Sequence, residues 1–388
     1  MSENHAIKGE AKLTFLEATG IILGHGVGSG ILAVPYLASR NSWRDIILVA
    51  AVCWIINYLM HLMIAELSYN NNGAQFIKCF EHELFTGKLK KVATMICFIF
   101  LGLSVLVNVS GYIAGAAAVF TSWFNLSKTA GMILYYLIAS VVVLFGLKLV
   151  GICEKYAMMA MVAVVLVLLC ASFQNPHWPL VNTFISGNNV LALYSMIAFS
   201  LSAVMSVPQV VKGLEGDTRK IKGAIAAGTG INLALILLIT FTTILGAGRG
   251  ISEDGALVDL ARSLGGWVSI VGYIFSLLAL STSFWANTLN LRDIIHEQTG
   301  WNNTVSFLTC SIPSLLLALF GAANFVGFTR LASVIQVMTG IGIIISYARS
   351  RKREKDSPIC GKYGTLVFRI LVVVSSFVAT FGALVKVM

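Results

Sequence analysis

Two clusters of residues that disfavour a regular helix each lie inside a long apolar stretch, and they offer the most distinctive chemistry in the sequence. The first cluster, Gly24-His25-Gly26-Val27-Gly28-Ser29-Gly30, has four glycines in seven residues. The second, Phe199-Ser200-Leu201-Ser202-Ala203-Val204-Met205-Ser206-Val207-Pro208, is rich in serine and ends in proline. Each glycine disfavours a helix by about 1 kcal/mol relative to alanine, and proline removes a backbone donor. We therefore predict a helix break in each stretch.

A broken helix exposes backbone groups that can bind charged ligands without charged side chains. The N–H groups that start its second half carry positive partial charge and suit a carboxylate; here they belong to Ser29, Gly30 and Ile31. The carbonyl groups around Gly24 and Val27 suit a cation or an ammonium group. A zwitterion and a cation can be held in this way, and no acidic residue lies at the centre of any apolar stretch, which fits this use of backbone and hydroxyl groups.

Several side chains outside the glycine-rich cluster complete a predicted ligand site. Tyr112 lies in Gly111-x-x-x-Gly115, where its hydroxyl can meet a carboxylate, although helix packing explains the same motif. Asn108 lies one turn earlier on the same face. Trp285 either lines a cavity or forms an interhelical hydrogen bond. The predicted site comprises Gly26, Gly28, Ser29, Gly30, Asn108, Tyr112, Phe199, Ser200, Ser202 and Trp285.

The composition places these residues in a membrane. The chain has 388 residues, of which 57% are hydrophobic and 11% charged, whereas soluble domains are nearer a quarter charged. A helix needs about 20 apolar residues to span the hydrocarbon, and no alternating pattern predicts a barrel. We predict an all-α integral membrane protein with eleven spans at 14–38, 45–69, 92–122, 130–150, 154–173, 190–212, 223–246, 266–291, 304–320, 324–346 and 364–387.

Lysine and arginine residues predict the orientation of these spans. With the N-terminal tail 1–13 placed in the cytoplasm, 20 of the 27 basic residues fall on the cytoplasmic side. This bias follows the positive-inside rule, so we predict a cytoplasmic N-terminus, an extracytoplasmic C-terminus and a location in the plasma or inner cell membrane. The tail lacks the apolar core of a signal peptide. Residues 73–91 are predicted to form a helix at the cytoplasmic interface.

The two predicted breaks occupy matching positions in two halves of the chain. When Pro35 is aligned with Pro208, a serine and a valine coincide as well. The breaks then fall in helices one and six, in five-helix units at 14–173 and 174–346 that have opposite topology because five is odd. A basic loop (347–363) and an eleventh helix (364–388) follow. Interrupted helices at matching positions of inverted halves indicate the binding site of a transporter.

In their order along the chain, these motifs resemble the amino acid–polyamine–organocation superfamily, and within it the aromatic/hydroxy amino acid permeases and the amino acid/auxin permeases. The motifs are the stretch 26–35, Glu66, 111–115, 206–208, and 282–284 with Asp293. The resemblance implies a five-plus-five inverted repeat with alternating access and a peripheral eleventh helix. It also implies import of a neutral, aromatic or large apolar amino acid in symport with Na⁺ or H⁺.

The resemblance leaves the coupling ion open. In the superfamily, paired hydroxyls on helix eight join carbonyls of helix one to bind sodium, which implies a candidate Na⁺ site at Gly24, Val27, Thr282 and Ser283. The same hydroxyls can instead bond to their own helix. Aromatic permeases usually carry an aromatic residue and a histidine where this chain has Ala203 and Val204, and often a glutamate at Ala118. These departures weaken the expectations of proton coupling and of aromatic selectivity.

Other classes of function receive less support. The net charge is +10, but the basic residues lie in short tracts between apolar segments, so we expect no nucleic-acid partner. The seven cysteines have no metal-ligand spacing, and no paired acids or His/Asp constellation lies at membrane depth. We expect a monomer that is no enzyme and has no cofactor. The alternatives are a transporter of another solute, such as a metal ion or nucleobase, or an amino acid receptor that does not transport.

Overall fold

The computed structural model describes residues 7, 11–28, 30–174, 176–177, 189–248, 251–252, 256–321, 340–354, 356 and 358–385, and these ranges contain helices but no β-strand. A helical segment at 340–353 and two short 3₁₀ turns, η1 (Val204–Ser206) and η2 (Gly361–Gly364), accompany the α-helices. The α-helices are α1 (Phe15–Gly26), α2 (Gly30–Ser39), α3 (Trp43–Asn70), α4 (Phe76–Glu83), α5 (Lys90–Phe124), α6 (Lys128–Leu144), α7 (Leu147–Gln174), α8 (Val190–Ser200), α9 (Val207–Gly213), α10 (Thr218–Ala247), α11 (Ala256–Leu264), α12 (Trp267–Thr299), α13 (Asn303–Leu319) and α15 (Leu366–Leu384).

Seven helical segments in the described ranges are long and apolar enough to cross a membrane: α3, α5, α7, the α8–α9 segment, α10, α12 and α15. The pair α1 and α2 makes an eighth if it is counted as one span, bent by 57°. Two shorter apolar helices, α6 and α13, have 17 residues each. The prediction of an all-helical, multi-pass membrane protein is therefore confirmed. Residues 324–339 of the predicted span 324–346 lie outside the described residues.

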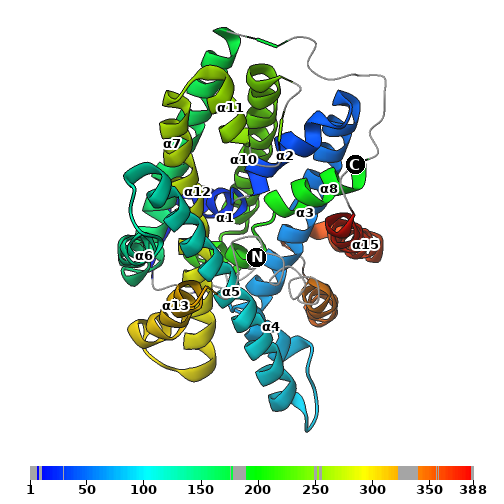
Figure 1. Cartoon of the computed structure of the whole chain (residues 1–388). Helices are drawn as coiled ribbons and strands as arrows, with labels where there is room; N and C mark the ends of the chain where they lie inside the picture. Colours follow the sequence, from blue (N-terminus) through cyan, green and yellow to red (C-terminus); the bar gives the residue numbers. More distant parts are fainter. Residues whose placement is uncertain are drawn as a thin grey trace.

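The first helix, α1, lies at the centre of the bundle, where it packs against α7, α10 and α12 (Figure 1). Small residues allow these close crossings. A Cβ atom at Gly20 would lie 2.8 Å from the backbone nitrogen of Lys155 on α7, and one at Gly228 on α10 would lie 3.0 Å from the Thr19 carbonyl oxygen. Glycine at such positions lets helix backbones approach closely in lipid. The core of the bundle thus forms around the helix that carries the first break.

Several helix boundaries differ from those predicted. The predicted spans 130–150 and 154–173 are separated in the structure at Phe145 and Gly146, and Gly146 has a φ of +83° that favours glycine. Consequently α7 begins at Leu147, seven residues before the predicted start. The predicted interfacial helix 73–91 is helical only at its centre, in α4, and α11 was not predicted. The segment 340–353 continues seven residues into the predicted basic loop.

A buried carboxylate fixes this last segment to the bundle. Glu66, near the end of α3, accepts hydrogen bonds from the Tyr347 hydroxyl (3.0 Å) and from the N–H groups of Ile359 (3.2 Å) and Cys360 (2.7 Å). An ion pair with Arg351 adds to them at 3.8 Å. Glu66 is fully buried, so these donors provide the hydrogen bonds that water would otherwise make to its carboxylate. Glu66 therefore has a structural role: it joins α3 to the part of the chain that precedes α15.

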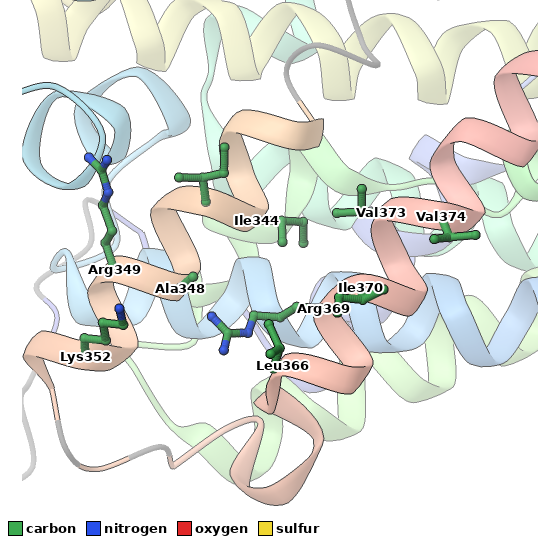
Figure 2. Close-up of a pocket in the computed structure, with 10 residues that line it drawn as sticks. Ile344, Ala348, Arg349, Lys352, Leu366, Arg369, Ile370, Val373 and Val374 are labelled. Atoms are coloured by element: carbon green, nitrogen blue, oxygen red, sulfur yellow. The ribbon is translucent and has the colours of Figure 1, made fainter.

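The helix α15 lies at the edge of the bundle, beside α8 (Figure 1). Between α15 and the segment 340–353 is an apolar groove with a volume of about 530 Å³, with Ile344, Ile370 and Val373 among its lining residues (Figure 2). None of the residues that line it belongs to α1, α2, α8 or α9. This groove is therefore separate from the broken helices.

Candidate functional site

The first predicted break is present between α1 and α2. The helix α1 ends at Gly26. The Val27 N–H still donates to the Leu23 carbonyl, but the ψ angle of Val27, 39°, is no longer helical. The next residue, Gly28, donates to the Gly26 carbonyl at 2.8 Å, and α2 begins at Gly30. Pro35 lies inside α2. Ser29, a predicted site residue, lies outside the described residues.

The second predicted break is present between α8 and α9. The helix α8 ends at Ser200, the chain passes through η1, and α9 starts at Val207 with Pro208 in its first turn. Proline suits that position because its missing N–H would have no helical partner there. Such a break leaves backbone groups that must be satisfied by other means.

Three side chains from neighbouring helices bind the backbone of the second break. They come from α3, α10 and α12, so the break is held from several sides. The contacts are His61 Nε2 with the Ala203 N–H (2.9 Å), Asn232 Nδ2 with the Ser200 carbonyl (2.7 Å), and Asn290 Nδ2 with the Met205 carbonyl (2.6 Å). Buried backbone groups are nearly always paired. These three residues were not predicted, because the sequence does not reveal which polar residue meets which break.

His61 is the most specific of these three positioning residues. Its Nδ1 lies against the Asn57 carbonyl and donates to it, which leaves Nε2 as the acceptor for Ala203. The ring is completely buried. The pair of contacts thus fixes one neutral tautomer of the imidazole.

Replacing His61 by leucine should lower the free energy of unfolding by about 1–3 kcal/mol, because the buried Ala203 N–H loses its acceptor. Thermal unfolding of the purified protein in detergent measures the effect. His61→Gln is the matched control, since its amide oxygen can still accept, and it should lose less. Equal melting temperatures for the leucine variant and the wild type would contradict this role.

The two breaks face each other at the centre of the bundle. His25 Nδ1 at the end of α1 lies 2.9 Å from the Ser206 hydroxyl of η1. A Cβ atom at Gly26 would lie 3.2 Å from the Ser200 carbonyl oxygen and would collide with the Asn232 amide. Two residues that the sequence analysis assigned to one site, Gly26 and Ser200, are therefore brought together.

The start of α2 makes a second contact with α8. A Cβ atom at Gly30 would collide with the Ser200 hydroxyl and would lie 3.0 Å from Cδ1 of Phe199. The Phe199 side chain is 41% exposed, whereas Ser200 is buried and donates to the Met196 carbonyl at 2.8 Å. Gly30, Phe199 and Ser200 therefore form one wall of the candidate site, next to the N-terminal end of α2.

The opposite wall comes from α5 and α12. Tyr112 is buried, and its hydroxyl lies against Ser283 and Asn287 of α12. Ser283 Oγ also lies 3.3 Å from where a Cβ atom of Gly28 would be. Asn108, one turn before Tyr112, is buried as well. Ser283 therefore links the buried polar groups of this wall to the first break.

Three predicted site residues have other contacts. The Trp285 indole N–H donates to the Ala139 carbonyl of α6 at 3.1 Å, which is an interhelical hydrogen bond. Thr282 donates to the carbonyl of Ala279 in its own helix at 3.0 Å. Ser202 is half-buried, and its N–H donates to the Phe199 carbonyl at 3.1 Å.

A buried acid lies beside the first break, at the start of the predicted span 154–173. Glu154 lies about two turns into α7 and is fully buried. A Cβ atom at Gly24 would collide with its carboxylate and would lie 3.0 Å from Cβ of Thr282. The predicted span 154–173 begins at this residue, whereas α7 begins at Leu147. No three His, Cys, Asp or Glu side chains form a metal-binding group in the described ranges.

A model of the tryptophan/tyrosine permease family matches residues 12–381 of the chain. The chain belongs to this family. The tryptophan-specific transport protein of Haemophilus influenzae is 22% identical to this permease over 399 aligned residues, which cover 94% of each chain. The tyrosine-specific transport system 1 of the same organism is 21% identical over 332 residues, covering 80% of this chain and 81% of the relative.

Solved transporter structures share the fold of this permease. MhsT in complex with L-phenylalanine has a TM-score of 0.73 at 14% identity, covering 96% of this chain and 99% of that one. A nucleobase-cation-symport-1 family transporter with bound bromovinylhydantoin, in a closed conformation, has a TM-score of 0.65 at 14% identity, covering 98% and 94%. These two structures contain different solutes. The likeness therefore shows the fold of this permease and does not identify its substrate.

Proposed function

We propose that this permease imports an aromatic amino acid by alternating access, in symport with Na⁺ or H⁺. The observation that carries the proposal is the meeting of two interrupted helices, with Gly26 and Gly30 of the first against Ser200 of the second. Interrupted helices facing each other near the middle of the membrane are where transporters of this kind bind solute. The relatives named for tryptophan and tyrosine transport support an aromatic substrate.

The substrate is proposed to bind with its carboxylate at the start of α2. The N-terminal end of that helix, at Gly30, carries positive partial charge, and the Tyr112 hydroxyl would donate a second contact. The ammonium group would meet carbonyl oxygens near Gly26, where α1 ends. The aromatic side chain would lie toward Phe199, Ser202 and the face of Trp285. Only the backbone and neutral side chains are needed, which keeps the cost of burying the zwitterion low.

The architecture proposed for transport is the five-plus-five inverted repeat with an eleventh peripheral helix. Helices in the units 14–173 and 174–346 would move relative to each other and open the site to either side in turn. The positive-inside bias supports a cytoplasmic N-terminus and an extracytoplasmic C-terminus. A monomer would suffice, because both breaks come from one chain.

A thermal-shift screen of the purified protein tests the substrate class. Tryptophan, tyrosine and phenylalanine should raise the melting temperature, because a ligand present at 100 times its Kd stabilises the folded state by about 2.7 kcal/mol. Alanine and D-tryptophan are the matched controls and should have little effect. Stabilisation by a nucleobase or a metal ion, with none by any aromatic amino acid, would contradict the proposal.

A further inference from the structure

The carboxylate of Glu154 has no partner among the described residues. The residue is fully buried in α7, and neither of its oxygen atoms accepts or donates a hydrogen bond there. Burying an ionised carboxylate without a partner costs several kcal/mol even after relaxation. Proteins keep such a group only where something else compensates its charge.

No ion pair or hydrogen bond among the described residues involves the Glu154 carboxylate, and charged side chains on its own helix have other partners. On the same helix, Lys148 binds Glu17 at 2.6 Å and the Lys155 ammonium lies over the Tyr156 ring at 4.4 Å. Four ionisable side chains on the helices that pack against α7 also have contacts elsewhere: His25 of α1 with Ser206, Lys220 of α10 with Asp217, Lys222 of α10 with the Pro358 carbonyl, and Arg292 of α12 with Asp293.

The position of Glu154 relates it to the first break. Its carboxylate lies against Gly24, within one turn of the end of α1 at Gly26. Thr282 of α12 also lies close to Gly24. Only glycine leaves room for the carboxylate at that point. The C-terminal end of α1, which carries negative partial charge, also attracts positive charge.

We propose that Glu154 is the anionic ligand of the coupling-cation site, and that a monovalent cation bound at its carboxylate compensates the charge. This inference rests on the proposed symport and deepens it. Sodium and the proton share the required chemistry, a single positive charge accepted by carboxylate oxygen. Carbonyl oxygens near Gly24 and the Thr282 hydroxyl would complete the oxygen ligands if the cation is sodium. Cation binding at this point is linked to the geometry of the break, and hence to substrate binding at Gly26 and Gly30.

Glu154→Gln tests the assignment in proteoliposomes. The side chain keeps its shape and loses its charge. Uptake of labelled L-tryptophan is measured under an inward sodium gradient at equal pH, and under an inward proton gradient in choline buffer without sodium. We expect the wild type to concentrate tryptophan under one of these gradients, which identifies the cation. The variant should take up tryptophan only to equilibrium under both, and should still exchange internal for external tryptophan.

Two further variants keep the test decisive. Glu17→Gln removes a buried acid from the same α1–α7 contact, where Lys148 compensates it, and should leave gradient-driven uptake intact. Glu154→Asp keeps the charge and should retain coupling with weaker cation affinity, even if the glutamine variant folds poorly.

Three results would overturn the inference. They are concentrative uptake by Glu154→Gln, loss of exchange by a folded Glu154→Gln protein, and exchange by a wild type that neither gradient drives. A wild type without any uptake or exchange would instead count against the proposed function itself.

Discussion

Gly26→Ala should lower the rate of aromatic amino acid uptake by roughly 5- to 150-fold. The added methyl group would collide with the Asn232 amide and would lie 3.2 Å from the Ser200 carbonyl, at the point where the two breaks meet. Overpacking of this kind costs about 1–3 kcal/mol, and each 1.4 kcal/mol corresponds to about a factor of ten. Initial rates of uptake into proteoliposomes, normalised to the amount of folded protein, measure the effect.

Gly230→Ala provides the matched control for this prediction. Gly230 also lies within a membrane-spanning helix, α10, but a Cβ atom there would approach nothing closer than the Trp54 indole nitrogen at 4.0 Å. Uptake by this variant should equal that of the wild type. If both variants were equally impaired, glycine would matter for helix flexibility in general, and the contact between the breaks would lose its special role.

Tyr112→Phe should raise the substrate KM by roughly 10- to 150-fold, with a smaller effect on stability. The substitution removes only the hydroxyl, which we propose donates to the substrate carboxylate. Hydrogen bonds to charged groups contribute about 1.5–3 kcal/mol, and each 1.4 kcal/mol is about tenfold in affinity. The concentration dependence of tryptophan uptake gives KM, and the shift in melting temperature with tryptophan gives an independent affinity.

Tyr136→Phe separates a binding effect from a structural one. The Tyr136 hydroxyl is 3.0 Å from the Ser311 hydroxyl of α13, away from the breaks. Loss of that bond should cost about 1 kcal/mol of stability and leave KM unchanged. An unchanged KM in Tyr112→Phe would contradict its proposed contact with the carboxylate.

The fold could be predicted to a large extent, because lipid imposes a simple rule on sequence. Long apolar segments must be helices, and most of them occur near the predicted positions. The breaks were predicted for an equally local reason: four glycines between Gly24 and Gly30, and a serine-rich segment ending at Pro208. Boundaries were less accurate where charged residues enter a helix, as at the start of α7.

The site was predicted only in the parts that lie on the broken helices themselves. Gly26, Gly30 and Ser200 were assigned from local sequence, and the structure brings them together. His61 and Asn232 could not be assigned, because each acts on a backbone group far away in sequence. Glu154 was missed for a related reason: its burial depends on which face of α7 meets α1, and the predicted span began only at this residue.

The most direct test of the central claim is counterflow with the purified protein. Proteoliposomes loaded with unlabelled L-tryptophan are diluted into a trace of labelled L-tryptophan, without any ion gradient. A transporter whose site opens alternately to both sides should accumulate label transiently, tyrosine outside should compete with it, and Gly26→Ala should slow it strongly. Absence of counterflow with tryptophan, tyrosine and phenylalanine, in a protein that remains folded and in the presence of either sodium or choline, would contradict the account.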